Sequence, residues 1–317
     1  MAIAIKPVGG LTPANIGESL RRKPDLKGAL FQFVMLFSLS ISIGVLVVLL
    51  YTVVSDAWPV LSTRLGDFVT GTLAPDAGRA GISQGLKGTF YLCVIVAIVA
   101  FPLGIAAAIY LEEYAPRTRL SSFIEVNIRN LAGVPSVVYG ILGLAIFVNG
   151  WGISALTGGR SPLAGGLTLA ALVLPVVIIT TQEAIRAVPS ALREAGFGVG
   201  ATKWEVIKDH ILPYAAPGIL TGTLLSIARA AGEAAPLLLV GTITGFISNS
   251  PGWFDVRQVQ DKFAAMPTII TSWAKQPEEG FRVENAAAAI VVLVAFVILL
   301  NSAAILLRNR FEAKRAG

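Results

Sequence analysis

One apolar segment, residues 215–243, reads AAPGILTGTLLSIARAAGEAAPLLLVGTI and is long enough to cross a lipid bilayer as a helix. A helix rises about 1.5 Å per residue, so about 20 residues span a hydrocarbon core of roughly 30 Å. The segment nevertheless carries two charged residues near its middle, Arg229 and Glu233. Because a charge at the bilayer centre costs about 2.5–3.5 kcal/mol on insertion scales, we expect this pair to serve packing or function.

The composition of the chain is that of a protein with several membrane spans. Of its 317 residues, 55% are hydrophobic and 14% are charged, whereas soluble domains contain about 25% charged residues. Six apolar segments are candidate transmembrane helices, and the third and fourth are only marginally long: 29–54, 88–111, 131–148, 163–182, 215–243 and 285–307. The first is longer than the apolar part of a signal peptide, about 7–15 residues, and is predicted to be an uncleaved anchor. The sequence therefore predicts an all-α integral membrane protein with six transmembrane helices.

The distribution of Lys and Arg predicts the orientation, because cytoplasmic loops of membrane proteins are enriched in these residues. If both termini are cytoplasmic, the inner tails and loops hold about twice as many Lys and Arg as the outer loops. The sequence thus favours cytoplasmic N- and C-termini. The external segment 245–284 is rich in aromatic residues, which are typical of a helix at the membrane–water interface.

The connection between the fourth and fifth segments is expected to form two short helices. Ser190, which follows Pro189, is a candidate N-cap of the first, and Thr202 is a candidate N-cap of a second that runs through His210. Three glycines offer a turn between them: Gly196, Gly198 and Gly200. Taken alone, the pattern also fits an ordinary amphipathic linker on the membrane surface.

This connection resembles the EAA motif of ABC importer permeases, whose pattern is E-A-A-x3-G-x9-I-x-L-P. Two positions depart from it, since Gly196 replaces the second alanine and His210 stands where isoleucine is usual. The resemblance implies that the loop docks on a cytoplasmic ATPase subunit and transmits its movement. The residues assigned to this coupling are Glu194, Ala195, Gly196, Gly200, Leu212 and Pro213.

Four further segments resemble phosphate importer permeases of the PstA type. They are PLGIAAAIYLEEYAP (102–116), NLAGVPSVVYGILGLAIFV (130–148), LTLAALVLPVVIITTQEAIRAVP (167–189) and ARAAGEAAPLLLVG (228–241). The resemblance implies the type I ABC importer permease fold, inorganic phosphate as substrate and a bacterial or archaeal cytoplasmic membrane. It also implies three kinds of partner: a homologous permease of the PstC type, two ATPase subunits of the PstB type and an extracytoplasmic phosphate-binding protein of the PstS type.

The resemblance also organises the chain into segments. A cytoplasmic tail at 1–28 precedes a peripheral helix at 29–54. The core permease domain at 85–310 holds five transmembrane helices and the coupling loop 183–213, and a cytoplasmic tail at 311–317 follows. In the resembled family external loops receive the binding protein, which gives 245–284 a second interpretation beside the interfacial helix.

Arg229 and Glu233 are four residues apart, which places them on one face of a continuous helix. In the resembled permeases this span lines the translocation path, and the arginine and glutamate matter for phosphate transport. A guanidinium presents a planar fork of donors that matches phosphate oxygens, and a nearby carboxylate can hold the arginine when substrate is absent. From the residues alone, a structural ion pair that fixes helix packing is an equal alternative.

The sequence offers few residues for catalysis. His210 is the single histidine, so no metal-binding set and no nucleophile–base pair is apparent, and the GVGATKW run lacks the spacing of a P-loop. We therefore expect no cofactor in this chain, with ATP and Mg bound by the partner ATPase, and no nucleic acid. Two alternatives stay open: a permease for molybdate, tungstate or sulfate, and a secondary transporter or channel.

Overall fold

The computed structural model describes residues 26–150, 152–243 and 259–313. Most of the predicted N-terminal tail, the end of the C-terminal tail and part of the 245–284 segment lie outside these residues. The chain divides into two compact units, Met1–Thr52 and Val53–Gly317. The described part of the first unit belongs to one apolar helix, α2 (Leu26–Thr70), whose candidate membrane-crossing window is unburied.

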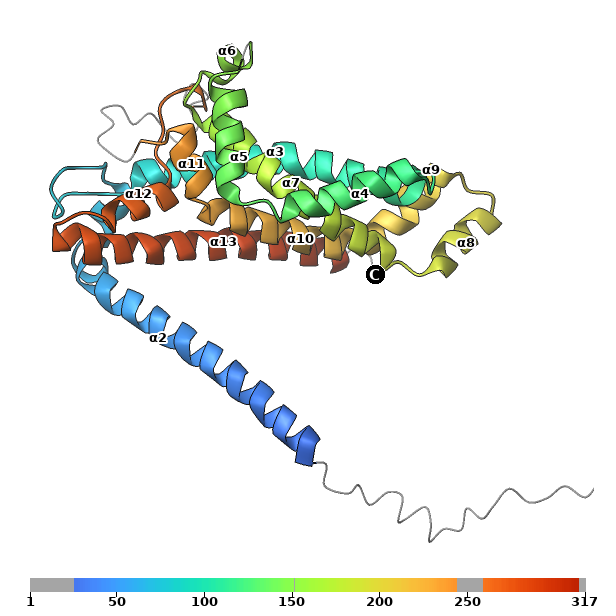
Figure 1. Cartoon of the computed structure of the whole chain (residues 1–317), viewed down its shortest axis with the longest axis horizontal. Helices are drawn as coiled ribbons and strands as arrows, with labels where there is room; N and C mark the ends of the chain where they lie inside the picture. The colour runs from blue at the N-terminus through green and yellow to red at the C-terminus, as the bar shows by residue number, and fades with distance from the viewer. Residues whose placement is uncertain (1–25, 151, 244–258, 314–317) are drawn as a thin grey trace, which may run out of the picture. The chain divides into compact units, whose positions relative to one another are not determined.

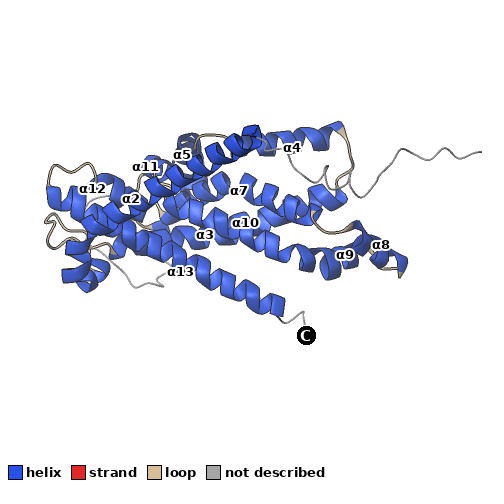
Figure 2. Cartoon of the chain, turned by 90° about the horizontal axis from the view of Figure 1, so that it is seen from below, coloured by secondary structure: helices blue, strands red, loops and turns tan. Residues whose placement is uncertain are grey.

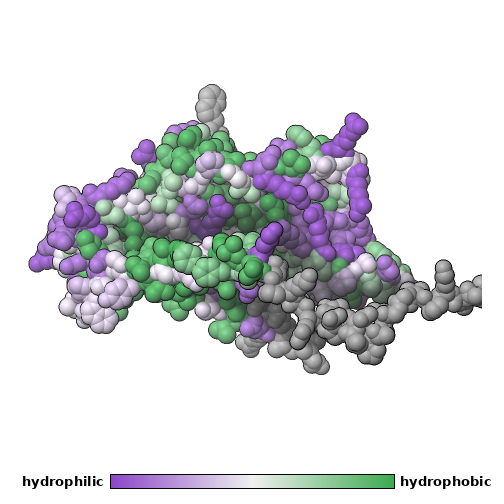
Figure 3. Space-filling view, turned by 60° about the horizontal axis from the view of Figure 1, so that its bottom comes forward, coloured by the Kyte–Doolittle hydropathy of each residue, from purple (hydrophilic) through white to green (hydrophobic). Residues whose placement is uncertain are grey.

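The second unit is a helical bundle whose long members run between two groups of short helices (Figures 1 and 2). At one end lie α8 (Ser190–Gly198) and α9 (Lys203–Val206), and at the other lie α11 (Ala235–Val240) and α12 (Met266–Trp273). The long helices between them are α3 (Ser83–Ile109), α7 (Pro162–Arg186), α10 (Leu212–Gly232) and α13 (Ala286–Ala313). Figure 3 shows extensive apolar surface with hydrophilic patches beside it, and apolar surface of this extent marks contact with a membrane or another protein.

The described residues contain five helices that are long and apolar enough to cross a membrane. A sixth span results if a bent pair is counted as one, and this pair corresponds to the predicted 131–148 segment. Its first part is α4 (Arg119–Ala132), and its second is α5 (Ser136–Gly143) with the π-helical turn η2 (Leu144–Val148). The two parts meet at 100°. The helix is therefore interrupted within the predicted 131–148 segment, because Pro135 restricts the residue before it and cannot donate within a helix.

The predicted 215–243 helix is also interrupted. α10 ends at Gly232, Glu233 has extended backbone angles of φ −78° and ψ 117°, and α11 begins at Ala235. Proline at position 236 could not donate a backbone hydrogen bond to Gly232, and glycine is itself a weak helix former. The fifth predicted span is therefore one long and one short helix.

Close packing of small residues joins the long helices. A Cβ added at Gly218 of α10 would lie 2.8 Å from Cβ of Ala184 on α7, and one at Gly222 would collide with Thr180. This is the role that we expect for the glycines of a GxxxG pair, since small residues let helix backbones approach in a membrane. Three buried side chains of the predicted external segment, Phe263, Trp273 and Phe281, pack into core clusters, so they are not interfacial anchors.

The first helix is longer than the predicted apolar segment 29–54. α2 continues past residue 54 to Thr70, and non-helical angles at Arg64 mark a kink. The guanidinium of Arg64 donates hydrogen bonds to the carbonyls of Ala77 and Ala80, at 2.6 and 3.0 Å, and to Oδ1 of Asn285, at 2.5 Å. The end of α2 is thereby fixed to the loop that follows it and to η5 (Gly280–Asn285), the π-helical turn before α13.

Candidate functional site

The interruption of α10 places Arg229 and Glu233 together. Arg229 lies in the last turn of α10, and Glu233 is the residue that follows the helix. The prediction that both lie on one face of a continuous helix is therefore wrong for Glu233. Its carboxylate nevertheless turns back along α10, so that the Nε atom of Arg229 lies 3.5 Å from Oε1 of Glu233.

The two interrupted spans pair with each other. α5 and α11 lie side by side and turn away from the long helices (Figure 1). A Cβ added at Gly140 of α5 would lie 2.7 Å from Cα of Pro236 in α11, so glycine permits this contact. The hydroxyl of Tyr139 donates to the carbonyl of Leu131 at 2.9 Å and so ties α5 to α4 across their bend. The pairing places α5 beside the short helix that follows Glu233.

Arg229 retains donors for another acceptor. The side chains of Arg229 and Glu233 are 44% and 20% exposed. Among the described residues, Glu233 is the only hydrogen-bond or ion-pair partner of Arg229. A guanidinium has five N–H donors, and a bond of 3.5 Å uses one of them weakly. This geometry is more suited to receiving an anion than to locking two helices together.

A groove follows α10 on the side that carries Arg229. It is an open groove of about 570 Å³ along the line where α7 and α10 meet. Leu225 lines it and lies four residues before Arg229, hence on the same helix face. The groove is mixed in character and is lined by Thr180, Glu183, Ala184, Pro217, Gly218, Thr221, Gly222 and Leu225.

In the coupling loop, two local features agree with the prediction from the sequence and two differ from it. Thr202 caps α9 in a capping box with Glu205, and Gly200 has a positive φ of 83°, as a glycine turn requires. Ser190 is the first residue of α8 and not its N-cap, which is Pro189. The second helix does not stop at His210 but continues through the π-helical turn η3 (Ile207–Ile211) into α10.

The residues of the EAA-like motif divide into exposed and packed positions. Glu194 and Ala195 are exposed, and Gly196 is buried where an added Cβ would lie 2.8 Å from Cγ2 of Val206. The departure from alanine at 196 therefore lets α8 approach α9. Leu212 and Pro213 are half-buried in the first turn of α10. Exposed apolar side chains surround the turn, namely Phe197, Val199 and Trp204.

Residues 100–317 match the family described as "Binding-protein-dependent transport system inner membrane component". The chain belongs to this family. It is a component of a transport system and a multi-pass protein of the inner membrane. The match begins within α3 and includes both interrupted spans and the coupling loop.

Individual relatives within this family have more specific names. The phosphate transport system permease protein PstA 1 of Mycobacterium tuberculosis is 35% identical over 295 residues, which cover 92% of this chain and 90% of the relative. PstA of Mycobacterium leprae is 38% identical over 233 residues, 72% of each chain. The probable ABC transporter permease protein YqgI of Bacillus subtilis is 36% identical over 188 residues, 59% of this chain but only 62% of that protein.

Solved structures confirm the fold expected from the sequence, that of a type I ABC importer permease. An inward-facing structure of the MetNI methionine ABC transporter matches with a TM-score of 0.57 at 15% identity, covering 73% of this chain and 95% of that one. A second crystal form of MetNI matches with a TM-score of 0.52 at the same identity and covers 73% and 94%.

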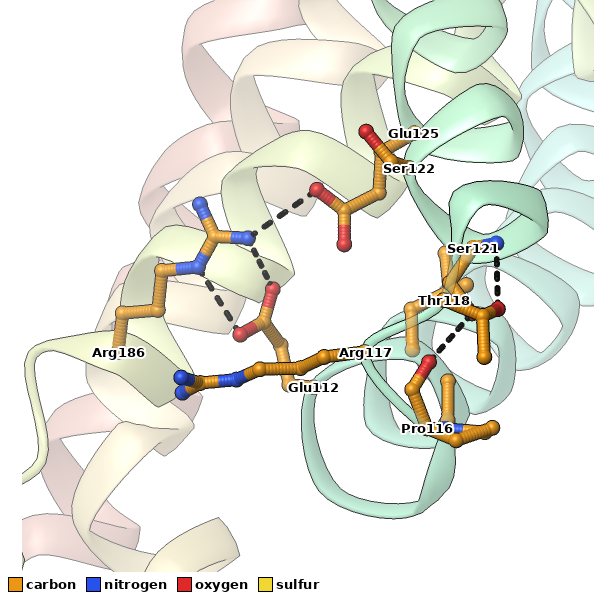
Figure 4. A pocket seen from close by; sticks show the side chains of 10 residues that line it. Glu112, Pro116, Arg117, Thr118, Ser121, Ser122, Glu125 and Arg186 are labelled. Carbon is orange, nitrogen blue, oxygen red and sulfur yellow. Dashed lines mark hydrogen bonds and ion pairs between the residues drawn. The ribbon is translucent and has the colours of Figure 1, made fainter.

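A group of charged residues at the start of the permease's coupling loop is not apparent from the sequence. At the end of α3, the π-helical turn η1 (Tyr110–Tyr114) carries Glu112 and Glu113. Arg186, the last residue of α7, contacts Glu112 through Nε at 2.9 Å and Nη2 at 2.5 Å, and its Nη2 lies 3.8 Å from Glu125 of α4 (Figure 4). These side chains border a cleft of about 500 Å³. Its charges balance, with Glu112 and Glu125 against Arg117 and Arg186.

Proposed function

We propose that this permease is the PstA-type transmembrane subunit of an ATP-driven importer of inorganic phosphate. The observation that carries the proposal is Arg229, which lies at the interruption of a span with most of its donors unused. The PstA relatives, one of them alignable over nearly the whole chain, support phosphate as the substrate. The groove between α7 and α10 offers a route along the same face of α10.

The chemistry of the substrate fits this site. A phosphate dianion that leaves water needs a compensating cation, and a guanidinium offers bidentate hydrogen bonds to two of its oxygens. Glu233 lies beside Arg229 and occupies it when phosphate is absent. Its negative charge then favours release, because two anions compete for one cation.

The proposal includes partners and an orientation. A second, homologous permease of the PstC type would complete the path, two PstB-type ATPases would hydrolyse ATP, and a PstS-type protein would deliver phosphate from outside. We place both termini and the coupling loop in the cytoplasm, following the bias of Lys and Arg. ATP and Mg would bind the ATPase, and this chain would contribute coupling through α8.

The substrate assignment is tested with the complete transporter in liposomes. We expect ATP hydrolysis to rise severalfold when binding protein that has been incubated with phosphate is added. With binding protein that has been incubated with sulfate or molybdate, we expect ATP hydrolysis to stay near its basal rate. The measurement is ATP turnover at matched amounts of complex, with unloaded binding protein as the control. Arginine alone does not distinguish tetrahedral oxyanions. If molybdate or sulfate stimulated ATP hydrolysis and phosphate did not, the stimulating anion would be the substrate and the assignment of phosphate would be wrong.

The orientation is tested with a reporter enzyme that is active only in the cytoplasm. We expect activity when it is fused after Gly317 and none when it is inserted at Asp76. Asp76 lies in the loop between α2 and α3, beyond the end of α2 at Thr70. Activity of the Asp76 insertion, in a chain that is inserted in the membrane, would contradict the orientation.

A further inference from the structure

Arg193 lies on α8 directly before Glu194 of the EAA-like motif, and its side chain points back into the bundle. Its Nε and Nη2 atoms donate to Oε1 of Glu113 at 3.3 and 3.0 Å. Nη1 donates to the carbonyl of Val188 at 2.9 Å, and Nη2 also donates to the carbonyl of Ile185 at 3.0 Å. One side chain therefore binds α8 both to the end of α7 and to η1 at the end of α3.

These contacts are shielded from solvent. The side chain of Arg193 is 26% exposed and that of Glu113 is 11% exposed. Hydrogen bonds between charged groups are roughly twice as strong as those between neutral groups, and partial burial reduces their screening by salt. Ile185 lies in the last turn of α7 and Val188 in the three-residue link that follows it, where carbonyls have fewer intrahelical donors than in the middle of a helix. Arg193 donates to both carbonyls while it also holds Glu113.

The contact with Glu113 adds a connection that the chain path lacks. Along the chain, α8 is joined to α7 by three residues, Ala187 to Pro189. Glu113 belongs to η1, which continues α3 without a break. Arg193 thus fastens α8 to α3 as well, and α3 packs along α7, which in turn packs on α10.

We propose that Arg193 is a positioning residue for energy coupling, which fastens α8 to α3 through Glu113. A displacement of α8 by the ATPase is then delivered to α3 and α7 as one body. From α7 it passes to α10, the helix that carries Arg229. This inference rests on the proposed function, because it takes α8 as the element that the ATPase moves.

The chain supplies a matched control on the same π-helical turn. Glu112 pairs with Arg186 as Glu113 pairs with Arg193, but Arg186 belongs to α7 and, among the described residues, has no hydrogen bond or ion pair with α8. Removing both charges with Glu112→Gln and Arg186→Gln deletes an ion pair of the same kind, and within the described part of the chain the only other ion-pair partner that loses a neighbour is the partly exposed Glu125, 3.8 Å from Arg186. If α8 is held by Arg193, this control should transport as the wild type does.

The first test compares phosphate uptake with ATP hydrolysis in the same liposomes, using the complete transporter. We expect Arg193→Gln and Glu113→Gln to lower the phosphate taken up per ATP at least about tenfold, with the amount of assembled complex within twofold of wild type. Arg193→Lys, which keeps the ion pair, should recover part of this ratio. A ratio that stays at the wild-type value, whether or not the amount of complex falls, would overturn the inference.

The second test needs no phosphate. In a complete transporter in which Cys93, the single cysteine of this chain, is replaced, spin labels at Ala191 on α8 and Leu103 on α3 report the distance between these helices. We expect one distance with and without ATP in the wild type, and an ATP-dependent or broadened distance with Arg193→Gln. An unchanged distance in that variant would contradict the inference. Absence of phosphate uptake by the wild type would instead overturn the proposed function, and the distance measurement would still test Arg193.

Discussion

Replacing Gly200 by valine is expected to uncouple ATP hydrolysis from transport and to lower phosphate uptake about tenfold or more. Gly200 has φ +83°, a conformation that β-branched residues avoid, and strain of this kind costs about 1–3 kcal/mol. The turn would relax by moving α8 relative to α9. This movement would displace Glu194, which is exposed on α8 and is assigned to coupling with the ATPase. Uptake and ATP turnover, each divided by the amount of complex, measure the effect.

Gly198 provides the control for this experiment. It is two residues away in the same exposed element, and an added Cβ meets no described atom within 4 Å at either position. Gly198 has no positive φ, so Gly198→Val adds the same side chain without the strain of the turn. Uptake by Gly200→Val that matches uptake by Gly198→Val would show that the turn geometry is unimportant for coupling.

Features that depend on neighbouring residues could be predicted from the sequence. Thr202 was predicted to cap a helix, because capping joins residues three apart. Gly200 was expected in a turn because glycine adopts positive φ without strain. The apolar segments likewise predicted the long helices, since length and hydropathy are local properties.

Features that depend on residues far apart in the sequence could not be predicted from it. Glu113 and Arg193 are 80 positions apart, and Glu112 and Arg186 are 74 apart. Nothing in the local pattern pairs them, because which acid meets which arginine follows from the packing of α3 against α7. The interruption after Gly232 was missed for a different reason. Pro236 lies within the apolar segment, but many prolines only kink a membrane helix, so its effect on Glu233 required the structure.

Replacing both Arg229 and Glu233 by glutamine is expected to reduce phosphate transport about 100-fold while the permease still folds and assembles. The ion pair between them is 3.5 Å long, and removing both charges together avoids the cost of leaving one charge without its partner. Its loss should therefore be tolerated. Loss of a charged contact to the anion costs roughly 2–5 kcal/mol, which accounts for the expected fall in uptake.

A second variant, Arg229→Lys, separates charge from geometry at this site. Lysine keeps the positive charge but loses the planar fork that binds two phosphate oxygens at once. We expect uptake between that of the wild type and that of the double variant, with the amount of assembled complex unchanged. If the pair were only structural, the double variant would assemble and take up phosphate at nearly the wild-type rate, and Arg229→Lys would do so too. That result, measured at matched amounts of complex, would remove Arg229 from the translocation path.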